Sequence, residues 1–371
     1  MDIDKEDKDS EFIEEKEVIE VYKNVIKEPN LQIKLIINID LDNEKINKID
    51  KVYELSDGRI AIIEKKGKNM KIYSLKNGKM ITKINQDNIL GIIELKNKDV
   101  VLNSKHEIFF YKLLPNKNYE LYQEINEFNQ GNNIFKKCIF NELEKTEYYK
   151  LNSIYQLMNN NLVSCNSYGI KIYKKDKDGQ YKLSFMKELG EEVKNVVEIK
   201  NNILIIFHIF VNLVSSTFEY YVFTIYKFDI GKQELTMLNQ SRMTDRQFNI
   251  GACLITYQLI NNYLFVRYGL SLGVYDISKD MEFVKYNFNG TGRNVSRFGF
   301  PVEKFICNYE GDIFVARDTD YEYRLFRFEN NSFKAYNLFP YIKRANGLIK
   351  LKNNNFIFFN KNSITLLNKI N

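Results

Sequence analysis

The sequence predicts an all-β fold, a seven-bladed β-propeller of four-stranded antiparallel blades. Three observations predict it. A unit of strand, polar turn and strand recurs seven times along the chain. Compact neighbouring units are about 40 residues apart, which is the period of a four-stranded propeller blade. An alternating apolar strand precedes the first unit, and the last unit lacks a fourth strand.

Each unit combines a turn rich in Asn, Asp or Gly with a strongly apolar second strand. These segments are 54–63, 94–103, 157–165, 198–206, 259–266, 308–316 and 351–359. A third strand follows each of them, at 70–79, 107–117, 170–180, 222–232, 272–280, 323–331 and 363–369. Apolar and polar residues alternate in these strands, and Asn, Asp and Gly tolerate the left-handed backbone of tight turns. The pattern therefore predicts strands and hairpins throughout.

The segment before the first unit is expected to complete the last blade. Apolar residues alternate strictly through 31–40, and the seventh unit ends after three strands. Pairing these two ends would remove the exposed sheet edges of an open array. We therefore expect the N-terminal strand to close the ring.

Two intervals between units are longer, at about 60 residues, and predict insertions into the repeat near 125–150 and 207–250. The propeller is expected to span 29–371, after an acidic, partly helical extension at 1–28. Ser10 can cap a helix over 11–27, because Val18, Tyr22 and Val25 fall on one face and Pro29 follows its end.

The third strands carry a family resemblance. The segments MKIYSLKNGKMI and LGVYDISKD resemble the WD-repeat family, with Tyr73 and Tyr275 at the position of the family's Trp and with Asp276 retained. The chain has no Trp, and the Gly-His pair that opens such repeats is absent. The resemblance implies a propeller that serves as an intracellular protein-binding scaffold.

Charge is unevenly distributed. The net charge is +6, but residues 1–20 hold ten acidic residues against three lysines, so that the remainder carries +13. Lysine, asparagine and isoleucine are all abundant, as an AT-rich coding bias would produce. That bias is a sufficient explanation for the basic charge, since dedicated nucleic-acid binders usually cluster Arg and Lys on one face, so nucleic-acid binding is possible but unsupported.

The sequence contains no recognisable catalytic constellation. Only His106 and His208 are present, neither in a motif, and the four cysteines form no CxxC pair. The segment NGTGRN lacks the preceding strand and following helix of a phosphate loop. We therefore expect no catalytic residues, no metal, no cofactor and no enzymatic activity. The charged start and the lack of an apolar run of about 20 residues predict a soluble, cytoplasmic protein without a transmembrane segment.

Arginines are concentrated after residue 240. In a propeller, the loops between second and third strands and between blades share one rim. The residues expected on this rim in blades five to seven are Arg267, Tyr268, Arg293, Arg297, Arg317, Tyr321 and Arg344. Arginine pairs with carboxylates and phosphates through two parallel hydrogen bonds, and tyrosine supplies an apolar anchor.

These residues predict a noncatalytic scaffold that binds an acidic or phosphorylated segment of a protein partner within a multiprotein complex. Three alternatives stay open. The arginines can be solvated residues paired with local acids, the protein can be a peripheral propeller that binds anionic lipid such as phosphoinositide, or it can be a propeller enzyme. The sequence does not determine the oligomeric state.

Overall fold

The computed structural model describes most strands of the chain and many of their connections. The described residues are 32–40, 49–64, 67–127, 151–189, 192–200, 202–211, 219–229, 231–243, 256–260, 263–268, 271–276, 282–283, 300–310, 313–318, 323–329, 332–337, 347–353, 355–360 and 363–370. The predicted helix at 11–27 and most of the predicted insertion near 125–150 lie outside them. Within these residues the fold is all-β, and its one helical element is the short 3-10 turn η2 (Ser56–Gly58).

Four of the sheets each consist of four consecutive antiparallel strands. The first contains β2 (Ile49–Leu55), β3 (Arg59–Glu64), β4 (Met70–Ser74) and β5 (Met80–Ile84). The second contains β6 (Gly91–Glu94), β7 (Val100–Asn103), β8 (Glu107–Leu113) and β9 (Tyr119–Asn126). The third contains β10 (Leu151–Gln156), β11 (Leu162–Asn166), β12 (Gly169–Lys175) and β13 (Tyr181–Glu188). The fourth contains β14 (Glu192–Lys200), β15 (Ile203–Val211), β16 (Glu219–Asp229) and β17 (Glu234–Met243).

The next strands form one continuous eight-stranded sheet. They are β18 (Thr256–Ile260), β19 (Tyr263–Tyr268), β20 (Ser271–Asp276), β21 (Glu282–Phe283), β22 (Phe300–Glu310), β23 (Ile313–Asp318), β24 (Tyr323–Glu329) and β25 (Ser332–Asn337). The start of β20 joins the two halves, because Ser271 and Leu272 pair with Pro301 and Phe300 of β22.

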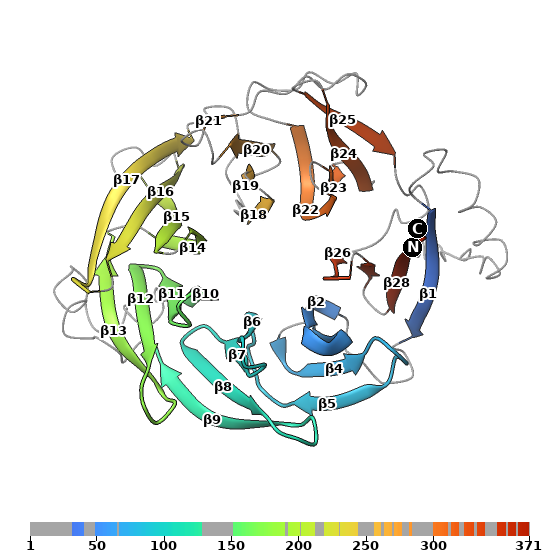
Figure 1. Cartoon of the computed structure of the whole chain (residues 1–371), viewed down its shortest axis with the longest axis horizontal. Coiled ribbons are helices and arrows are strands. Elements are labelled where there is room, and N and C mark those ends of the chain that lie inside the picture. The colour runs from blue at the N-terminus through green and yellow to red at the C-terminus, as the bar shows by residue number, and fades with distance from the viewer. Residues whose placement is uncertain are drawn as a thin grey trace, which may run out of the picture.

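The last sheet combines both ends of the described chain. It contains β26 (Gly347–Lys350), β27 (Phe356–Phe359), β28 (Ser363–Ile370) and, as its outer strand, β1 (Gln32–Asp40). Strand β1 pairs with β28 antiparallel from Gln32 opposite Ile370 to Asp40 opposite Ser363. Figure 1 shows the sheets following one another around a common centre, with β2, β6, β10 and β14 on the inside and β5, β9, β13 and β17 on the outside.

Tight turns separate the strands where the sequence predicts them. Between first and second strands, Asp57, Lys98, Asn160 and Asn202 have positive φ angles of 68°, 70°, 69° and 64°. Turns between third and fourth strands use the same geometry, as at Gly78, where φ is 67°. These left-handed positions favour Asn, Asp and Gly, which explains the recurring polar turns.

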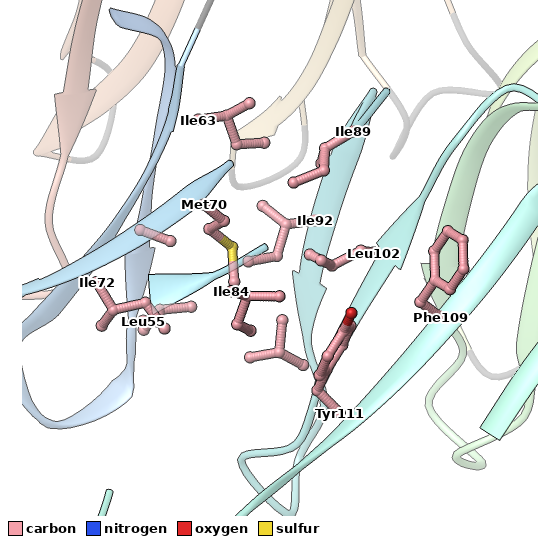
Figure 2. Packing of buried hydrophobic residues seen from close by; sticks show 12 residues of the cluster. Leu55, Ile63, Met70, Ile72, Ile84, Ile89, Ile92, Leu102, Phe109 and Tyr111 are labelled. Atoms are coloured by element: carbon pink, nitrogen blue, oxygen red, sulfur yellow. The ribbon is translucent and has the colours of Figure 1, made fainter. Parts of the chain in front are cut away.

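The core lies between successive sheets. In β3, Ala61 and Ile63 pack toward the second sheet, whereas Ile60 and Ile62 pack toward the sheet that contains β27. Figure 2 shows the first of these layers, in which Met70, Ile72, Leu102 and Tyr111 also meet. Strands covered on both faces carry nearly continuous apolar runs. Each fully buried aliphatic side chain contributes roughly 1.5–3 kcal/mol, so that contacts between sheets account for much of the stability.

The connections of each sheet lie at the two opposite ends of its strands, because the strands are antiparallel. One end carries the turns between first and second strands and between third and fourth strands, and we call this side of the molecule the turn face. Its described residues are 56–58, 75–79, 96–98, 114–118, 158–160, 176–180, 231–233 and 351–353. The opposite side, at the other ends of the strands, carries the connections between second and third strands and those between sheets, and we call it the loop face.

Candidate functional site

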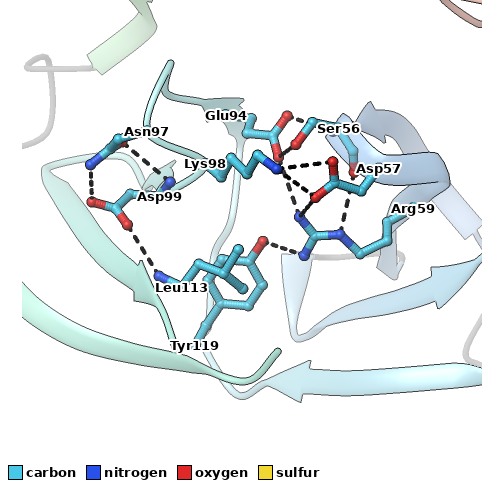
Figure 3. Close-up of polar contacts among 9 residues, drawn as sticks. All are labelled: Ser56, Asp57, Arg59, Glu94, Asn97, Lys98, Asp99, Leu113 and Tyr119. Atoms are coloured by element: carbon cyan, nitrogen blue, oxygen red, sulfur yellow. Dashed lines mark hydrogen bonds and ion pairs between the residues drawn. The ribbon is translucent and has the colours of Figure 1, made fainter. Parts of the chain in front are cut away.

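A dense polar cluster joins the first two sheets on the turn face (Figure 3). Arg59, at the start of β3, is buried, and its guanidinium donates to the hydroxyl of Tyr119 at 2.8 Å and to the backbone oxygen of Ser56 at 3.3 Å. The guanidinium also lies 3.5 Å from a carboxylate oxygen of Glu94. Glu94 accepts hydrogen bonds from the amide of Ser56 at 2.6 Å and from its hydroxyl at 2.8 Å. The buried charges are therefore paired within the cluster.

The outer part of the cluster is exposed. The ammonium group of Lys98 lies 2.9 Å from the carboxylate of Asp57, and both side chains are about half exposed. The hydrogen bond from Lys98 lowers the pKa of Asp57 below its usual value. Beside them, Asp99 accepts hydrogen bonds from the amide of Leu113 at 3.1 Å and from the side chain of Asn97 at 2.6 Å.

The contact between Glu94 and Ser56 recurs at other junctions. In each case a Glu or Gln at the end of a first strand accepts a hydrogen bond from a backbone N–H in the turn of the preceding sheet. The four pairs are Glu54 with Lys352 at 2.9 Å, Glu94 with Ser56, Gln156 with Lys96 at 3.0 Å, and Glu198 with Met158 at 2.5 Å. We call them the inter-sheet latches. They place the first turns of five successive sheets on one side of the molecule.

Two lysines are buried on equivalent third strands. Lys71 lies 3.0 Å from the carboxylate of Glu64, and Lys171 lies 2.9 Å from that of Glu127, where neither side chain is exposed to solvent. Burial lowers the pKa of Lys171, and the nearby Glu127 opposes this shift. Lys171 also donates to the backbone oxygen of Glu127.

The ion pair between Lys171 and Glu127 fixes the chain directly after β9, the last strand of the second sheet, where the connection to β10 begins. The amide of Glu127 donates to the backbone oxygen of His106 at 2.7 Å, and that of Leu151 donates to Lys105 at 2.8 Å. Both ends of this connection are therefore fixed to the loop between β7 and β8.

The described residues hold no recognisable reaction centre. No group of three or more His, Cys, Asp or Glu side chains among them is arranged to hold a metal ion. Burial raises the pKa of Cys165 to about 12, which removes thiolate character at neutral pH. Burial also lowers the pKa of His106. In the described part of the chain, no helix is long and apolar enough to cross a membrane.

Three of the seven predicted partner-binding residues lie in described strands. Arg267 and Tyr268 are the last two residues of β19, and Arg317 is next to last in β23. In the register of the strands, Arg267 lies opposite Leu272 and Arg317 lies opposite Tyr323, next to connections of the loop face. The other four, Arg293, Arg297, Tyr321 and Arg344, lie outside the described residues.

Arg267 and Arg317 occupy equivalent positions. In each second strand one residue pairs with the aromatic residue of the third strand, Leu264 with Tyr275 and Phe314 with Phe326. Arg267 and Arg317 each come three residues after it. In the first three sheets this position holds buried residues, namely Ile63, Asn103 and Cys165.

Comparison with known proteins identifies the architecture. No family model and no curated protein matches the sequence. Among solved structures, a protein from Lactobacillus plantarum superposes with a TM-score of 0.53 at 11% identity, over 77% of this chain and 82% of that one. Streptogramin B lyase gives 0.53 at 13% identity, over 91% and 98%. Raptor from Chaetomium thermophilum gives 0.58 at 10% identity, over 92% of this chain and 29% of its own.

The chain has a propeller-like, all-β fold. At these identities the likeness concerns the fold alone, and this chain spans less than a third of Raptor. Propeller-like neighbours include an enzyme, the lyase, so the fold does not decide between catalysis and binding.

Sequence reasoning missed the inter-sheet latches and the buried lysines. A signal for the latches exists, because Glu or Gln followed by Leu or Ile precedes the polar turn in ELS, ELK, QLM and EIK. The same pattern recurs as QLI at Gln258.

Proposed function

We propose that the protein is a seven-bladed propeller of the WD-repeat type, closed by β1, and that it acts as a noncatalytic scaffold for an acidic or phosphorylated segment of a protein partner. Three observations support closure of the ring. Strand β1 pairs with β28, Glu54 accepts a hydrogen bond from the amide of Lys352, and Ile60 and Ile62 share a core with Ile357.

The polar clusters of the first three sheets favour binding over catalysis. Arg59, Glu94, Lys171 and Glu127 are all used to join neighbouring sheets or to anchor a connection. Such pairs make the scaffold rigid but present no reactive group to a substrate.

The observation that carries the binding proposal is the pair of equivalent arginines, Arg267 and Arg317, on neighbouring second strands. Elsewhere the same position is buried, and a guanidinium there requires an acidic partner. The backbone register brings these two positions near the point where β20 and β22 join the halves of the sheet, and we infer that arginines there bind carboxylate or phosphate groups. Arg293, Arg297 and Arg344 would extend it along the loop face.

The test separates binding from packing. A fluorescent peptide rich in Asp and phosphoserine is titrated against the unmodified chain and the double variant Arg267→Gln, Arg317→Gln, and the binding is followed by anisotropy. We expect the double variant to weaken binding at least about 100-fold, since hydrogen bonds to charged groups contribute about 1.5–3 kcal/mol each and every 1.4 kcal/mol is about tenfold in affinity. A matched control, Lys68→Gln with Lys187→Gln, replaces two exposed lysines and should leave binding unchanged.

The same variants are unfolded in urea. If the double variant binds the peptide normally but unfolds at a lower urea concentration, the arginines serve packing between sheets and the proposal is wrong. Affinity capture from the protein's own cells, with Arg293→Glu, Arg297→Glu as the comparison, then identifies partners that depend on the loop face.

A further inference from the structure

The turn face is basic. Its described turns carry exposed lysines at positions Lys76, Lys79, Lys96, Lys98, Lys117, Lys177, Lys232 and Lys352. Three aspartates in or beside these turns have partners in the chain, whereas Asp178 is exposed. Asp57 pairs with Lys98, Asp176 pairs with Lys182 at 2.8 Å, and Asp229 accepts hydrogen bonds from two backbone amides of its own turn.

Three of these lysines form no ion pair with a described residue. No described carboxylate lies within ion-pair distance of the ammonium groups of Lys76, Lys79 or Lys352, although Glu54 accepts a hydrogen bond from the backbone N–H of Lys352 and is near its charge. The described connections of the loop face in the first sheets carry fewer exposed lysines, Lys68 and Lys105, with Asp87 also exposed there. Among the described residues, exposed lysines are therefore more numerous on the turn face.

The acidic N-terminal segment is attached at this face. Strand β28 follows a connection between second and third strands, so Ser363 lies at the loop face and Ile370 at the turn face. Gln32 pairs with Ile370, which places the first residue of β1 at the turn face. The chain that precedes Gln32 therefore leaves the sheet beside the lysines.

Length and charge suit the segment to these lysines. Residues 1–20 hold ten acidic residues against three lysines. Residues 21–31 connect them to β1, and a chain of that length spans at most about 36 Å. Lys352 is in the same sheet as β1, and Lys76 and Lys79 are in the turn between β4 and β5 of the next sheet.

We propose that the acidic segment at residues 2–20 binds the turn face of its own chain, against Lys76, Lys79 and Lys352, and shields this face from acidic ligands. Tethering raises the local concentration of the segment to the millimolar range. Exposed ion pairs are individually weak and are screened by salt. The bound segment therefore competes with ligands supplied in solution and is released as ionic strength rises. This inference concerns a different face from the arginine site and does not depend on it.

Zero-length cross-linking of the full chain tests the contact. A carbodiimide joins carboxylates to amines in direct contact, and mass spectrometry of an equal mixture of labelled and unlabelled chain separates links within a chain from links between chains. We expect links from residues 2–20 to Lys76, Lys79 and Lys352 to exceed those to Lys68 and Lys187, which are equally exposed near the loop face. Equal yields on both faces, no links from the segment, or links only between chains would overturn the proposal.

Competition tests the shielding. A fluorescent peptide with the sequence of residues 2–20 is titrated against the unmodified full chain and against a full chain in which these acids are replaced by their amides. The neutralised chain should bind the peptide at least about tenfold more tightly, because its tethered competitor is lost. Adding Lys76→Gln, Lys79→Gln and Lys352→Gln should abolish the gain, whereas adding Lys68→Gln and Lys187→Gln should preserve it. Equal affinity of the unmodified and neutralised chains, or no binding to either, contradicts the inference.

Discussion

Replacing Glu94 with alanine should destabilise the protein far more than replacing Lys98, although both residues form ion pairs in the same cluster. Glu94 accepts two hydrogen bonds from Ser56 and lies 3.5 Å from the guanidinium of Arg59, whose side chain is only 5% exposed. Removing one member of a buried ion pair costs about 3–5 kcal/mol, because the remaining charge loses its partner. Lys98 and Asp57 are 48% and 54% exposed, and solvent screens pairs of this kind.

The assay is urea unfolding followed by circular dichroism or tyrosine fluorescence, since the chain has no tryptophan. Glu94→Ala should lower the unfolding free energy by about 3–5 kcal/mol, and Lys98→Ala should leave the midpoint almost unchanged. Glu94→Gln is the matched control, because it retains an acceptor oxygen and removes the charge, and it should lie between them. Equal losses for Glu94→Ala and Lys98→Ala would show that the latch does not stabilise the junction.

Three further predictions concern ionisable groups that are buried, as Lys171 and Cys165 are, or partly buried, as His106 is. Lys171→Met should cost about 3–5 kcal/mol in urea unfolding by leaving Glu127 buried and unpaired, and adding Glu127→Gln should restore part of the loss; no recovery would contradict this pairing. Burial lowers the pKa of His106 below its ordinary 6.5, so the unfolded state binds more protons below that pH. Stability should therefore decline as pH falls below 6.5, and His106→Gln should reduce the slope in thermal unfolding curves measured across that range; an unchanged slope argues against it. Cys165 should resist iodoacetamide in the native protein and react in urea, as read by peptide mapping, whereas rapid native labelling would show that its site opens.

The sequence pattern predicts the all-β class and the positions of many strands and turns well, because both depend on local chemistry. Strands such as β3 and β11 are apolar along their whole length, and the left-handed turn positions at Asp57 and Asn160 suit their residues. Tyr73, placed by the WD-repeat resemblance at the position of the family's Trp, is fully buried against the last sheet.

The buried lysine could not be predicted in the same way. In MKIYS and IKIYK, a lysine between two apolar residues indicates a solvent-facing position in a strand with one exposed face. Here both faces of the third strand are covered by neighbouring sheets, so Lys171 is buried and needs Glu127. That partner is 44 residues earlier in the chain, and no local pattern connects the two.

The partner-binding prediction depends on seven residues after 240, and only three of them lie in described strands. Arg267 and Arg317 follow from the repeat itself, because equivalent positions in consecutive units lie at the same edge of their sheets. Arg293, Arg297, Tyr321 and Arg344 lie outside the described residues, between strands whose spacing in the sequence varies from unit to unit, and a repeat pattern carries little information about such segments.

The pairing of β1 with β28 has a consequence for biosynthesis. Strand β1 is synthesised before every other described strand, whereas its partner β28 is synthesised after all of them. Until β28 is made, QIKLIINID lacks its native strand partner, and an unpaired apolar strand is the kind of segment that aggregates or recruits chaperones. This sheet can assemble only after β28 has left the ribosome, so a ribosome stalled before β28 would hold a chain whose earlier sheets can fold while β1 has no partner.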